Sequence, residues 1–371
     1  MYQEGLASFN PGPAFYRAES AIARDLAVLC AHVYRQTRGQ LRVLDTMTGS
    51  GVRPLRYVLE AQADWVWANE GNVDLAPTLR ANLAVLPPHR YQLTHENSQR
   101  LCLRCHQNRD FYDLVDIDNF GNPAVHIDTG LGATRLGGLL YLTNTDGRST
   151  SGHDPQASLR IYSAHARWQP AVHEQGLRLL LGRAAQTAAS RGLGVEPLFS
   201  LFTRQVHRVM VRLVPQVTLD EKTYGFIAYC HGCGHLQTLI WPQLGRVSCP
   251  CQLEGGEARV VVSGPLWIGP LHDDNQLGTM ATLAQEWGWR AQVDLLEVMA
   301  AEAHLPPYYY LLGEMGRRGR MDIPNRDRLI AALQSAGYQA TRPHAEPQAV
   351  KTTASFSRCL SIARRLGSQP V

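Results

Sequence analysis

The segment VLDTMTGSGVRPLRY (residues 43–57) decides the fold. An apolar strand pattern ends at Asp45, a turn contains Gly49 and Gly51, and a helical pattern follows. Glycines let a ligand approach the backbone closely, and the first turn of a helix offers free N–H groups to an anionic ligand. The segment therefore predicts a nucleotide-binding turn between a strand and a helix of an α/β fold.

Strand and helix patterns alternate on both sides of this turn. The expected helices are 17–36, 72–84 and 171–190, and the expected strands are 41–45, 65–70, 91–94, 112–118 and 139–146. Two antiparallel-looking runs, 195–204 and 207–214, close the series. Strands separated by helices predict a parallel sheet. A final hairpin on such a sheet is the arrangement of a Rossmann-like class I methyltransferase.

The residues of the turn distinguish two kinds of ligand. A dinucleotide fingerprint needs a third glycine where this chain has Pro54-Leu55, and Asp45 would repel a pyrophosphate. An acid at this point can instead receive the ammonium of a methionine moiety. Glu70, which ends the next strand, can accept both hydroxyls of a ribose. The pattern favours S-adenosylmethionine over the alternative of a purely structural glycine turn.

A second strand-end turn, YDLVDIDNFGNP (112–123), carries the candidate chemistry. The acceptor Asp118 and the aromatic Phe120 suit amine methylation, because an acceptor can hold the amine hydrogens while a ring stacks on a flat base. Transfer then depends mainly on positioning. We expect Asp116 and Asp118 to point to opposite sides of the strand, so that only Asp118 lines the pocket. The alternative is a turn with a capping Asp and a core Phe.

Four cysteines form two close pairs in the second half of the chain. They are Cys230, Cys233, Cys249 and Cys251. Thiolates at this spacing suit a tetrahedral structural zinc ion, in which His231 or His235 could replace one cysteine. The alternative is four unligated thiols.

Positive charge is concentrated at the C-terminal end. The whole chain carries a net charge of +4, whereas residues from Gly316 onward contain ten basic and three acidic residues. A basic surface permits nucleic acid binding, although it can also be merely solvated. Helical patterns at 292–303, 307–317 and 325–336 predict a winged-helix-like group. We expect a catalytic domain at 1–218 and a C-terminal α/β domain with a zinc ribbon at 219–371.

Nothing in the sequence indicates a membrane or an export signal. No apolar run approaches the roughly 18 residues that span a bilayer, and the first residues lack a basic and an apolar region. We therefore expect a cytoplasmic protein with no membrane association, and we infer no obligate protein partner.

Three quoted segments resemble one known family. FYRAESAIARDL (15–26) is similar to F-Y-N-P-x-M-x-x-N-R-D, LDTMTGSGVRPLRY (44–57) to L-D-A-L-x-A-S-G-I-R-x-L-R, and DIDNFGNP (116–123) to D-I-D-P-F-G-S-P. These are motifs of the tRNA (guanine-26-N2)-dimethyltransferases, and they occur here in the family's order. By this resemblance the chain is expected to methylate the exocyclic N2 amine of a guanine in tRNA, once or twice, and to grip tRNA with its C-terminal domain.

The resemblance also implies roles for individual residues. Those expected to contact S-adenosylmethionine are Arg24, Arg53, Glu70, Asn97 and Ser98. Asp118 falls on the family's catalytic aspartate and Phe120 on its base-stacking aromatic.

The sequence departs from the family pattern at three positions. Glu70 and Asn97 replace aspartates, and Asn119 replaces a proline, which relaxes the turn and adds an amide that could itself bond the base. These departures leave open the number of methyl groups. They also leave two alternatives, which are an rRNA or protein amine methyltransferase and a non-catalytic RNA-binding protein with a decayed cofactor site.

Overall fold

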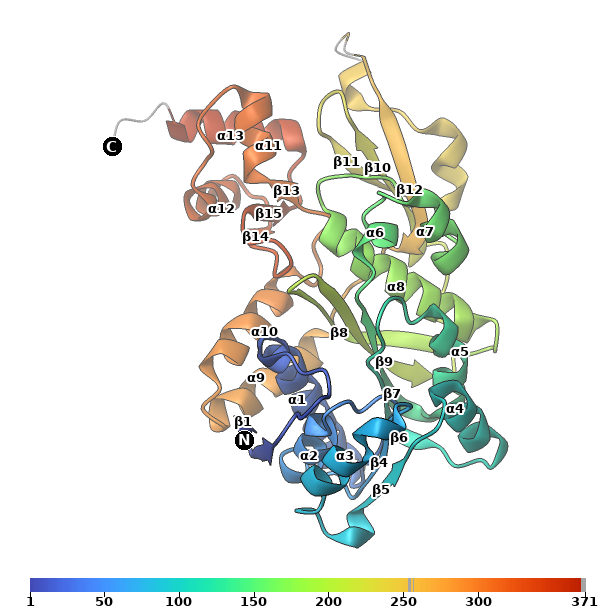
Figure 1. Cartoon of the computed structure of the whole chain (residues 1–371). Helices are drawn as coiled ribbons and strands as arrows, with labels where there is room; N and C mark the ends of the chain where they lie inside the picture. Colours follow the sequence, from blue (N-terminus) through green and yellow to red (C-terminus); the bar gives the residue numbers. More distant parts are fainter. Residues whose placement is uncertain (253–254, 256, 368–371) are drawn as a thin grey trace. The chain divides into compact units, whose positions relative to one another are not determined.

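The computed structural model describes residues 1–252, 255 and 257–367, which form two compact units (Figure 1). Unit 1 comprises Met1–Asp146, Ala184–Thr218 and Asn275–Leu296, and unit 2 comprises Gly147–Arg183, Leu219–Asp274 and Glu297–Val371. The expected boundary after residue 218 is one of the points where the chain passes between units. The chain crosses at other points as well, and helices α8 and α10 each run from one unit into the other.

Unit 1 is built on a seven-stranded sheet in the order β5-β4-β3-β6-β7-β9-β8. The strands from β5 to β7 are parallel, and β9 pairs antiparallel with both β7 and β8. This is the predicted parallel sheet with a terminal hairpin, so the Rossmann-like methyltransferase fold is confirmed. The strands are β3 (Arg42–Asp45), β4 (Trp65–Asn69), β5 (Tyr91–Thr94), β6 (Tyr112–Ile117), β7 (Thr134–Asn144), β8 (Gly194–Thr203) and β9 (Val206–Val214).

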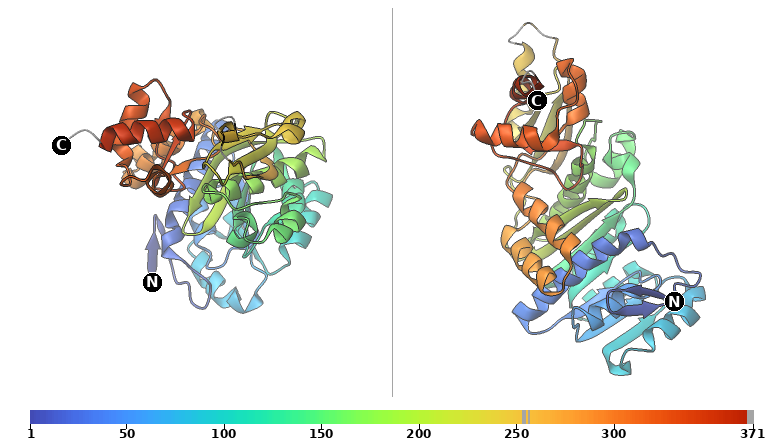
Figure 2. Two further views of the ribbon diagram at one scale, coloured as in Figure 1. Left: turned by 90° about the horizontal axis from the view of Figure 1, so that it is seen from above. Right: turned by 90° about the vertical axis from the view of Figure 1, so that its left-hand side faces the viewer.

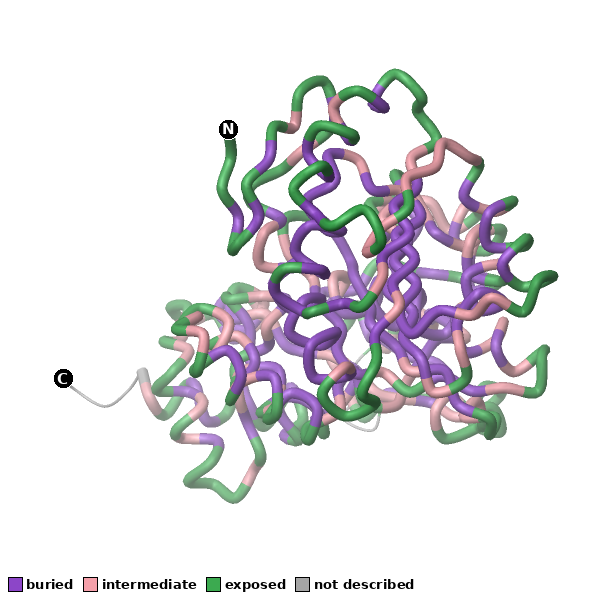
Figure 3. The backbone as a smooth tube through the Cα atoms, turned by 90° about the horizontal axis from the view of Figure 1, so that it is seen from below, coloured by how far each residue is buried: buried purple, intermediate pink, exposed green. Residues whose placement is uncertain are grey.

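Helices cover both faces of this sheet, which explains why every residue of β6 is buried. Figure 3 shows buried backbone in the interior and exposed backbone in the peripheral loops. Helices α1 to α3 lie on one side and α4 with α5 on the other (Figure 1). The hairpin of β1 (Tyr2–Glu4) and β2 (Ala7–Phe9) packs against α2 (Figure 2). The helices are α1 (Ala21–Arg38), α2 (Val52–Leu59), α3 (Ala76–Leu83), α4 (Ser98–Gln107), α5 (Ala124–Ala133) and α9 (Asp274–Glu286), of which α4, α5 and α9 are not predicted from the sequence pattern.

Unit 2 contains two small antiparallel sheets that share one apolar core. The first has the order β11-β10-β12 and the second β13-β15-β14. Ile227 of the first sheet and Val350 of the second belong to the same buried cluster. The strands are β10 (Tyr224–Cys230), β11 (Leu236–Leu239), β12 (Val260–Trp267), β13 (Tyr310–Leu311), β14 (Ala340–Thr341) and β15 (Ala349–Thr352).

The helices of unit 2 include the predicted winged-helix-like group. The helices that lie wholly or partly in unit 2 are α6 (Gly147–Thr150), α7 (Pro155–Tyr162), α8 (Val172–Ala189), α10 (Arg290–Glu302), α11 (Leu312–Gly319), α12 (Arg326–Ser335) and α13 (Phe356–Gly367). The element order β13, α11, α12, β14, β15 and the strand order β13-β15-β14 are those of a winged helix. Helix α11 starts later than predicted, because Tyr310 and Leu311 pair with β15.

Candidate active site

A cavity of about 720 Å³ opens in unit 1, beside the turns that follow β3, β4 and β6. This is where open α/β sheets bind ligands. Its volume lies within the roughly 300 to 1,000 Å³ of typical ligand pockets. Nine residues singled out from the sequence line it, namely Arg24, Gly49, Arg53, Glu70, Asn97, Ser98, Asp118, Asn119 and Phe120.

Two of the predicted cofactor residues do not line the cavity. Asp45 is completely buried, and its carboxylate lies 3.4 Å from the Arg53 side chain. Gly51 adopts a φ of +82° as the residue before α2, and a Cβ there would lie 3.1 Å from the Leu79 side chain. Both residues therefore support the turn without lining the cavity. Asp45 does so by its contact with Arg53, which does line the cavity.

Glu70 fixes the conformation of the glycine turn. One of its carboxylate oxygens accepts a hydrogen bond from the Gly49 N–H at 2.9 Å, and the other accepts one from the Asn72 N–H at 2.9 Å. Each carboxylate oxygen has a further lone pair. Glu70 can therefore hold the turn and still accept hydrogen bonds from the hydroxyl groups of a ligand in the cavity.

Asn97 and Ser98 lie at the start of α4. The Asn97 side-chain oxygen caps the helix by accepting from the N–H groups of Gln99 and Arg100, both at 3.1 Å. This cap uses the side-chain oxygen of a residue that the resemblance expects to contact S-adenosylmethionine. Asn is a preferred N-cap residue, so the replacement of an aspartate at this position preserves the helix start.

Three aspartates surround Arg53. Its guanidinium contacts the carboxylates of Asp118, Asp116 and Asp45, and it donates to the Met47 carbonyl at 2.7 Å. The expectation that Asp116 and Asp118 point to opposite sides is wrong, because both carboxylates contact the same side chain. Residues two apart in a strand share a face. Only Asp118 lines the cavity, as expected, because Asp116 lies deeper.

The surroundings separate the pKa values of these two acids. Burial raises the pKa of Asp118, but the positive charges of Arg53 and Arg208 outweigh it and hold that pKa below its usual value. Burial raises the pKa of Asp116 to about 7, and Arg53 only partly opposes this effect. The Tyr57 hydroxyl donates to Asp116 at 2.7 Å. Asp118 is therefore the ionised acceptor at the cavity wall at neutral pH.

Two aromatic rings stand at the mouth of the cavity. Phe120 is 73% exposed, and its ring meets that of Phe15 edge-on with the centroids 4.9 Å apart. The Asn119 side-chain nitrogen donates to the Phe120 carbonyl at 2.9 Å and so braces its own turn, whereas the side-chain oxygen has no hydrogen-bond partner among the described residues. Sequence reasoning identified Phe120 but missed Phe15, although Phe15 lies inside the segment FYRAESAIARDL.

Arg208 of β9 is a second lining residue that the sequence did not suggest. It belongs to none of the motifs quoted above, and the run that contains it was noted only as a strand. Its place at the cavity follows from the antiparallel pairing of β9 with β7, in which Arg208 lies opposite Thr143. Local sequence patterns carry no signal for such a position.

The four predicted metal ligands come together in unit 2. The sulfur atoms of Cys233 and Cys249 lie 3.3 Å apart, as do those of Cys249 and Cys251, and those of Cys230 and Cys251 lie 3.8 Å apart. A zinc–sulfur bond of about 2.3 Å places tetrahedral sulfurs about 3.8 Å apart. The residues therefore fit a zinc ion held by four cysteines.

A second group of side chains in unit 2 also has metal-ligand chemistry. Ligand atoms of His272, Glu302 and His344 all lie within 4.8 Å of one another. The Lys351 ammonium is 3.8 Å from Glu302 and 2.6 Å from Glu174, which also pairs with Arg178. Two carboxylates thus already face two basic side chains, so this group needs no cation for charge balance.

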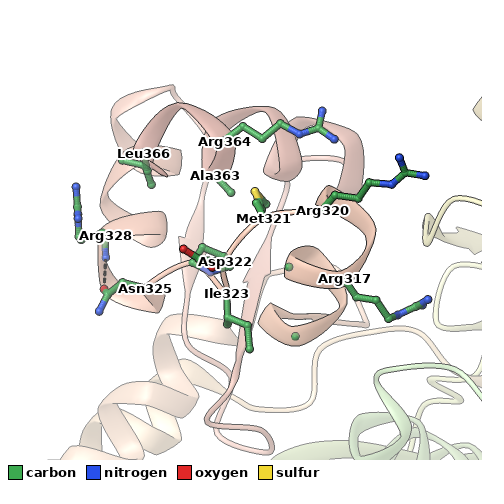
Figure 4. Close-up of a pocket in the computed structure, with 13 residues that line it drawn as sticks. Arg317, Arg320, Met321, Asp322, Ile323, Asn325, Arg328, Ala363, Arg364 and Leu366 are labelled. Carbon is green, nitrogen blue, oxygen red and sulfur yellow. Dashed lines mark hydrogen bonds between the residues drawn. The ribbon is translucent and has the colours of Figure 1, made fainter. Parts of the chain in front are cut away.

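A basic groove of about 1170 Å³ lies among α11, α12 and α13 of unit 2 (Figure 4). Its lining contains four arginines and one acid, namely Arg317, Arg320, Arg328, Arg364 and Asp322. Ile323, which is exposed, lies beside them.

Among the described residues, no helix is both long enough and apolar enough to cross a membrane.

Comparisons with known proteins agree with this geometry. The model of the family described as N2,N2-dimethylguanosine tRNA methyltransferase matches residues 4–364. The tRNA (guanine(26)-N(2))-dimethyltransferase of Pyrococcus horikoshii is 27% identical, over 97% of this chain and 94% of the relative. That of Aeropyrum pernix is 29% identical, over 95% and 90%. The structure of Trm1 from Pyrococcus horikoshii with S-adenosyl-L-methionine superimposes with a TM-score of 0.83 at 26% identity, covering 97% of this chain and 98% of that one.

Proposed function

The chain belongs to the N2,N2-dimethylguanosine tRNA methyltransferase family, and we propose that its cavity presents guanine 26 of tRNA for methylation at the exocyclic N2 amine. The chain is an S-adenosylmethionine-dependent methyltransferase. The observation that carries the site assignment is the ionised Asp118 carboxylate, which lines a cavity beside a glycine turn and an exposed aromatic ring.

The lining of the cavity suits S-adenosylmethionine. When bound, this cofactor supplies an electrophilic methyl group on a sulfonium sulfur. Glu70 offers carboxylate oxygens to the ribose hydroxyls, and the α4 start at Asn97 and Ser98 borders the same cavity. Arg24 lines it as well, held in place by Glu4 at 2.6 Å. The cavity thus offers both donors and acceptors to the polar parts of the cofactor.

Asp118 and Phe120 are proposed to hold the guanine. An ionised carboxylate accepts hydrogen bonds but cannot donate one. Asp118 can therefore accept a hydrogen bond from the amine and leave the lone pair of the nitrogen directed away from the carboxylate. The exposed Phe120 ring provides a stacking surface for the base. Asp118 also stands where a proton released by the amine can be received.

Transfer to tRNA tests the proposal directly. The full chain is incubated with labelled S-adenosylmethionine and unmodified tRNA, and the nucleosides are separated afterwards. The expected product is N2-methylated guanosine, absent from a transcript in which guanine 26 is replaced by adenine. Label found only in rRNA or in protein would contradict the proposed substrate.

Unit 2 is proposed to hold tRNA through its basic groove. Arginine suits phosphate groups because its planar fork can make two hydrogen bonds. Replacing Arg320 and Arg328 with alanine should weaken tRNA binding and lower the slope of log affinity against log salt by about 2, roughly one for each phosphate that an arginine neutralises. The control is Arg80→Ala, which removes an exposed arginine of unit 1. An unchanged salt dependence would exclude the groove.

The cysteine group is proposed to hold structural zinc, since all four sulfurs fill the coordination positions. The Cys230→Ser protein should lose its metal and unfold more readily, because metal binding free energy contributes to folding. Elemental analysis and thermal unfolding measure the two effects. The control is Cys102→Ser of α4, which should keep its metal content. Wild-type protein purified without metal would reject the site.

We also propose a cytoplasmic location, because tRNA is the substrate. Fractionation of cells that express the full chain tests it, and recovery with the membrane fraction would contradict it.

A further inference from the structure

Arg208 of β9 lies in the same row of the sheet as Asp118. Thr143 of β7 pairs with Arg208, and Leu142 pairs with Ile117, the residue just before Asp118. Asp118, Thr143 and Arg208 therefore occupy neighbouring positions across three adjacent chain segments. Asp118 and Arg208 both line the cavity, and the charge of Arg208 contributes to the low pKa of Asp118.

The guanidinium of Arg208 differs from those of its neighbours. Arg53 contacts three carboxylates, and Arg24 is bound by Glu4. Arg208 is only 7% exposed, yet its Nη1 atom has no hydrogen-bond partner among the described residues, and its Nη2 reaches the Ser20 hydroxyl at 3.5 Å. A buried donor without a partner costs stability. A ligand acceptor in the cavity would satisfy it.

Guanine carries the matching acceptor next to the groups that Asp118 binds. The N2 amine and the N1–H are donors, and the O6 carbonyl follows them on the same edge of the base. A carboxylate therefore suits one end of this edge and a guanidinium the other. Arginine is a frequent partner of guanine O6. Adenine has an amine at the O6 position, which would face the arginine donors without forming a hydrogen bond.

We infer that Arg208 determines the specificity for guanine by donating a hydrogen bond to O6 of the target base. This inference rests on the proposed function, because it assumes that the base enters beside Asp118. Arg208 acts on the part of the base that does not react, so it selects the substrate and sets its orientation.

The test combines a protein change with a base change. Wild-type and Arg208→Met proteins are assayed on tRNA that carries guanine or 6-thioguanine at the target position. The thiocarbonyl keeps the N2 amine and N1–H but accepts hydrogen bonds weakly. We expect 6-thioguanine to lower kcat/KM of the wild type about 10-fold or more, and Arg208→Met to lower kcat/KM on guanine by about 10- to 100-fold. The variant should be affected little further by 6-thioguanine.

Controls separate this role from a structural one. Arg212→Met changes an arginine four residues further along β9, which pairs with Glu196 outside the cavity, and it should behave like the wild type. Arg208→Lys keeps the charge and should recover part of the activity. If Arg208→Met does not fold, Arg208→Lys takes its place in the assay with guanine and 6-thioguanine. Calorimetry with S-adenosylmethionine should give the same affinity for all folded variants.

Each outcome has a distinct meaning. Equal 6-thioguanine effects in the wild type and in Arg208→Met would overturn the inference and place Arg208 on another group, such as a phosphate. Full activity of Arg208→Met on guanine would overturn it as well. No transfer by the wild type to any guanine-bearing tRNA would instead contradict the proposed function.

Discussion

Two clusters of buried charge, one in each unit, use similar residues in different ways. In unit 1, Arg53 faces the three acids Asp45, Asp116 and Asp118, and one of these acids lines the cavity. In unit 2, Glu174 and Glu302 face Arg178 and Lys351, together with His272 and His344.

The difference lies in charge balance and access. The unit 1 cluster has more acids than bases, and Asp118 is part of a cavity wall. The unit 2 cluster pairs its carboxylates with bases, and its side chains are at most 2% exposed. The unit 1 cluster around Arg53, here called the open cluster, has excess negative charge and can bind an incoming donor. The unit 2 cluster around Glu302, here called the sealed cluster, is balanced in charge and holds its own elements together. The comparison therefore distinguishes the proposed reactive site from a structural one.

The largest expected effect concerns the open cluster. Asp118→Asn should lower kcat by about 10²- to 10⁴-fold, because the amide cannot serve as an ionised acceptor. Single-turnover methylation measures this effect, and the thermal unfolding midpoint should change little. Asp74→Asn, an exposed acid outside the cavity, is the control. Near-normal turnover of Asp118→Asn would show that the open cluster is not the reactive one.

A substitution in the sealed cluster should lower the stability of the fold. Glu302→Ala leaves Lys351 and two histidines without a shared acceptor, so we expect a loss of about 3–5 kcal/mol in stability. Urea unfolding measures it. Glu297→Ala, an exposed acid on the same helix α10, should have almost no effect. If Glu302→Ala were as stable as the wild type, the cluster would have no structural role.

The third expected effect is a difference in pH dependence, which is gradual and small within any one pH unit. Burial raises the pKa of Asp116 to about 7, so its contribution to stability is full below its unfolded pKa near 4 and is lost as the pH rises toward 7. Burial lowers the pKa of His272 to about 4, although Glu302 opposes this, so its contribution is full above about 6.5 and is lost as the pH falls toward 4.

Asp116→Asn should therefore gain stability relative to the wild type as the pH rises from 4 to 7, by at most about 1.4 kcal/mol per pH unit. Thermal unfolding at several pH values measures the difference. Asp64→Asn, an exposed acid paired with Arg35, is the control. A parallel pH profile of Asp116→Asn and the wild type would contradict the raised pKa.

The sequence was sufficient for the sheet and for most of the cavity wall. Strand ends at Asp45, Glu70 and Asp118 can be read from apolar runs followed by polar turns, and parallel strands bring such ends to one edge. The grouping of the four cysteines follows equally from local spacing.

Other features depend on contacts between distant segments. Arg208 reaches the cavity through the pairing of β9 with β7, and Phe15 meets Phe120 from a segment far away in the sequence. The sealed cluster joins Glu174, Glu302 and Lys351, which belong to no shared motif. The faces of Asp116 and Asp118, in contrast, could have been predicted, since strand periodicity alone places them together.

The exposed pair Phe15 and Phe120 has an energetic consequence for the RNA. Removing a base from a stacked helix costs a few kcal/mol, and stacking a base on one aromatic ring returns about 1–3 kcal/mol. Contact with one ring can therefore offset part of that cost, and contact with two rings at a single mouth can offset more of it. We expect an extruded base to cover the apolar surface that is exposed to water at this point, and RNA junctions whose base is already loosely held to bind at the lower unstacking cost.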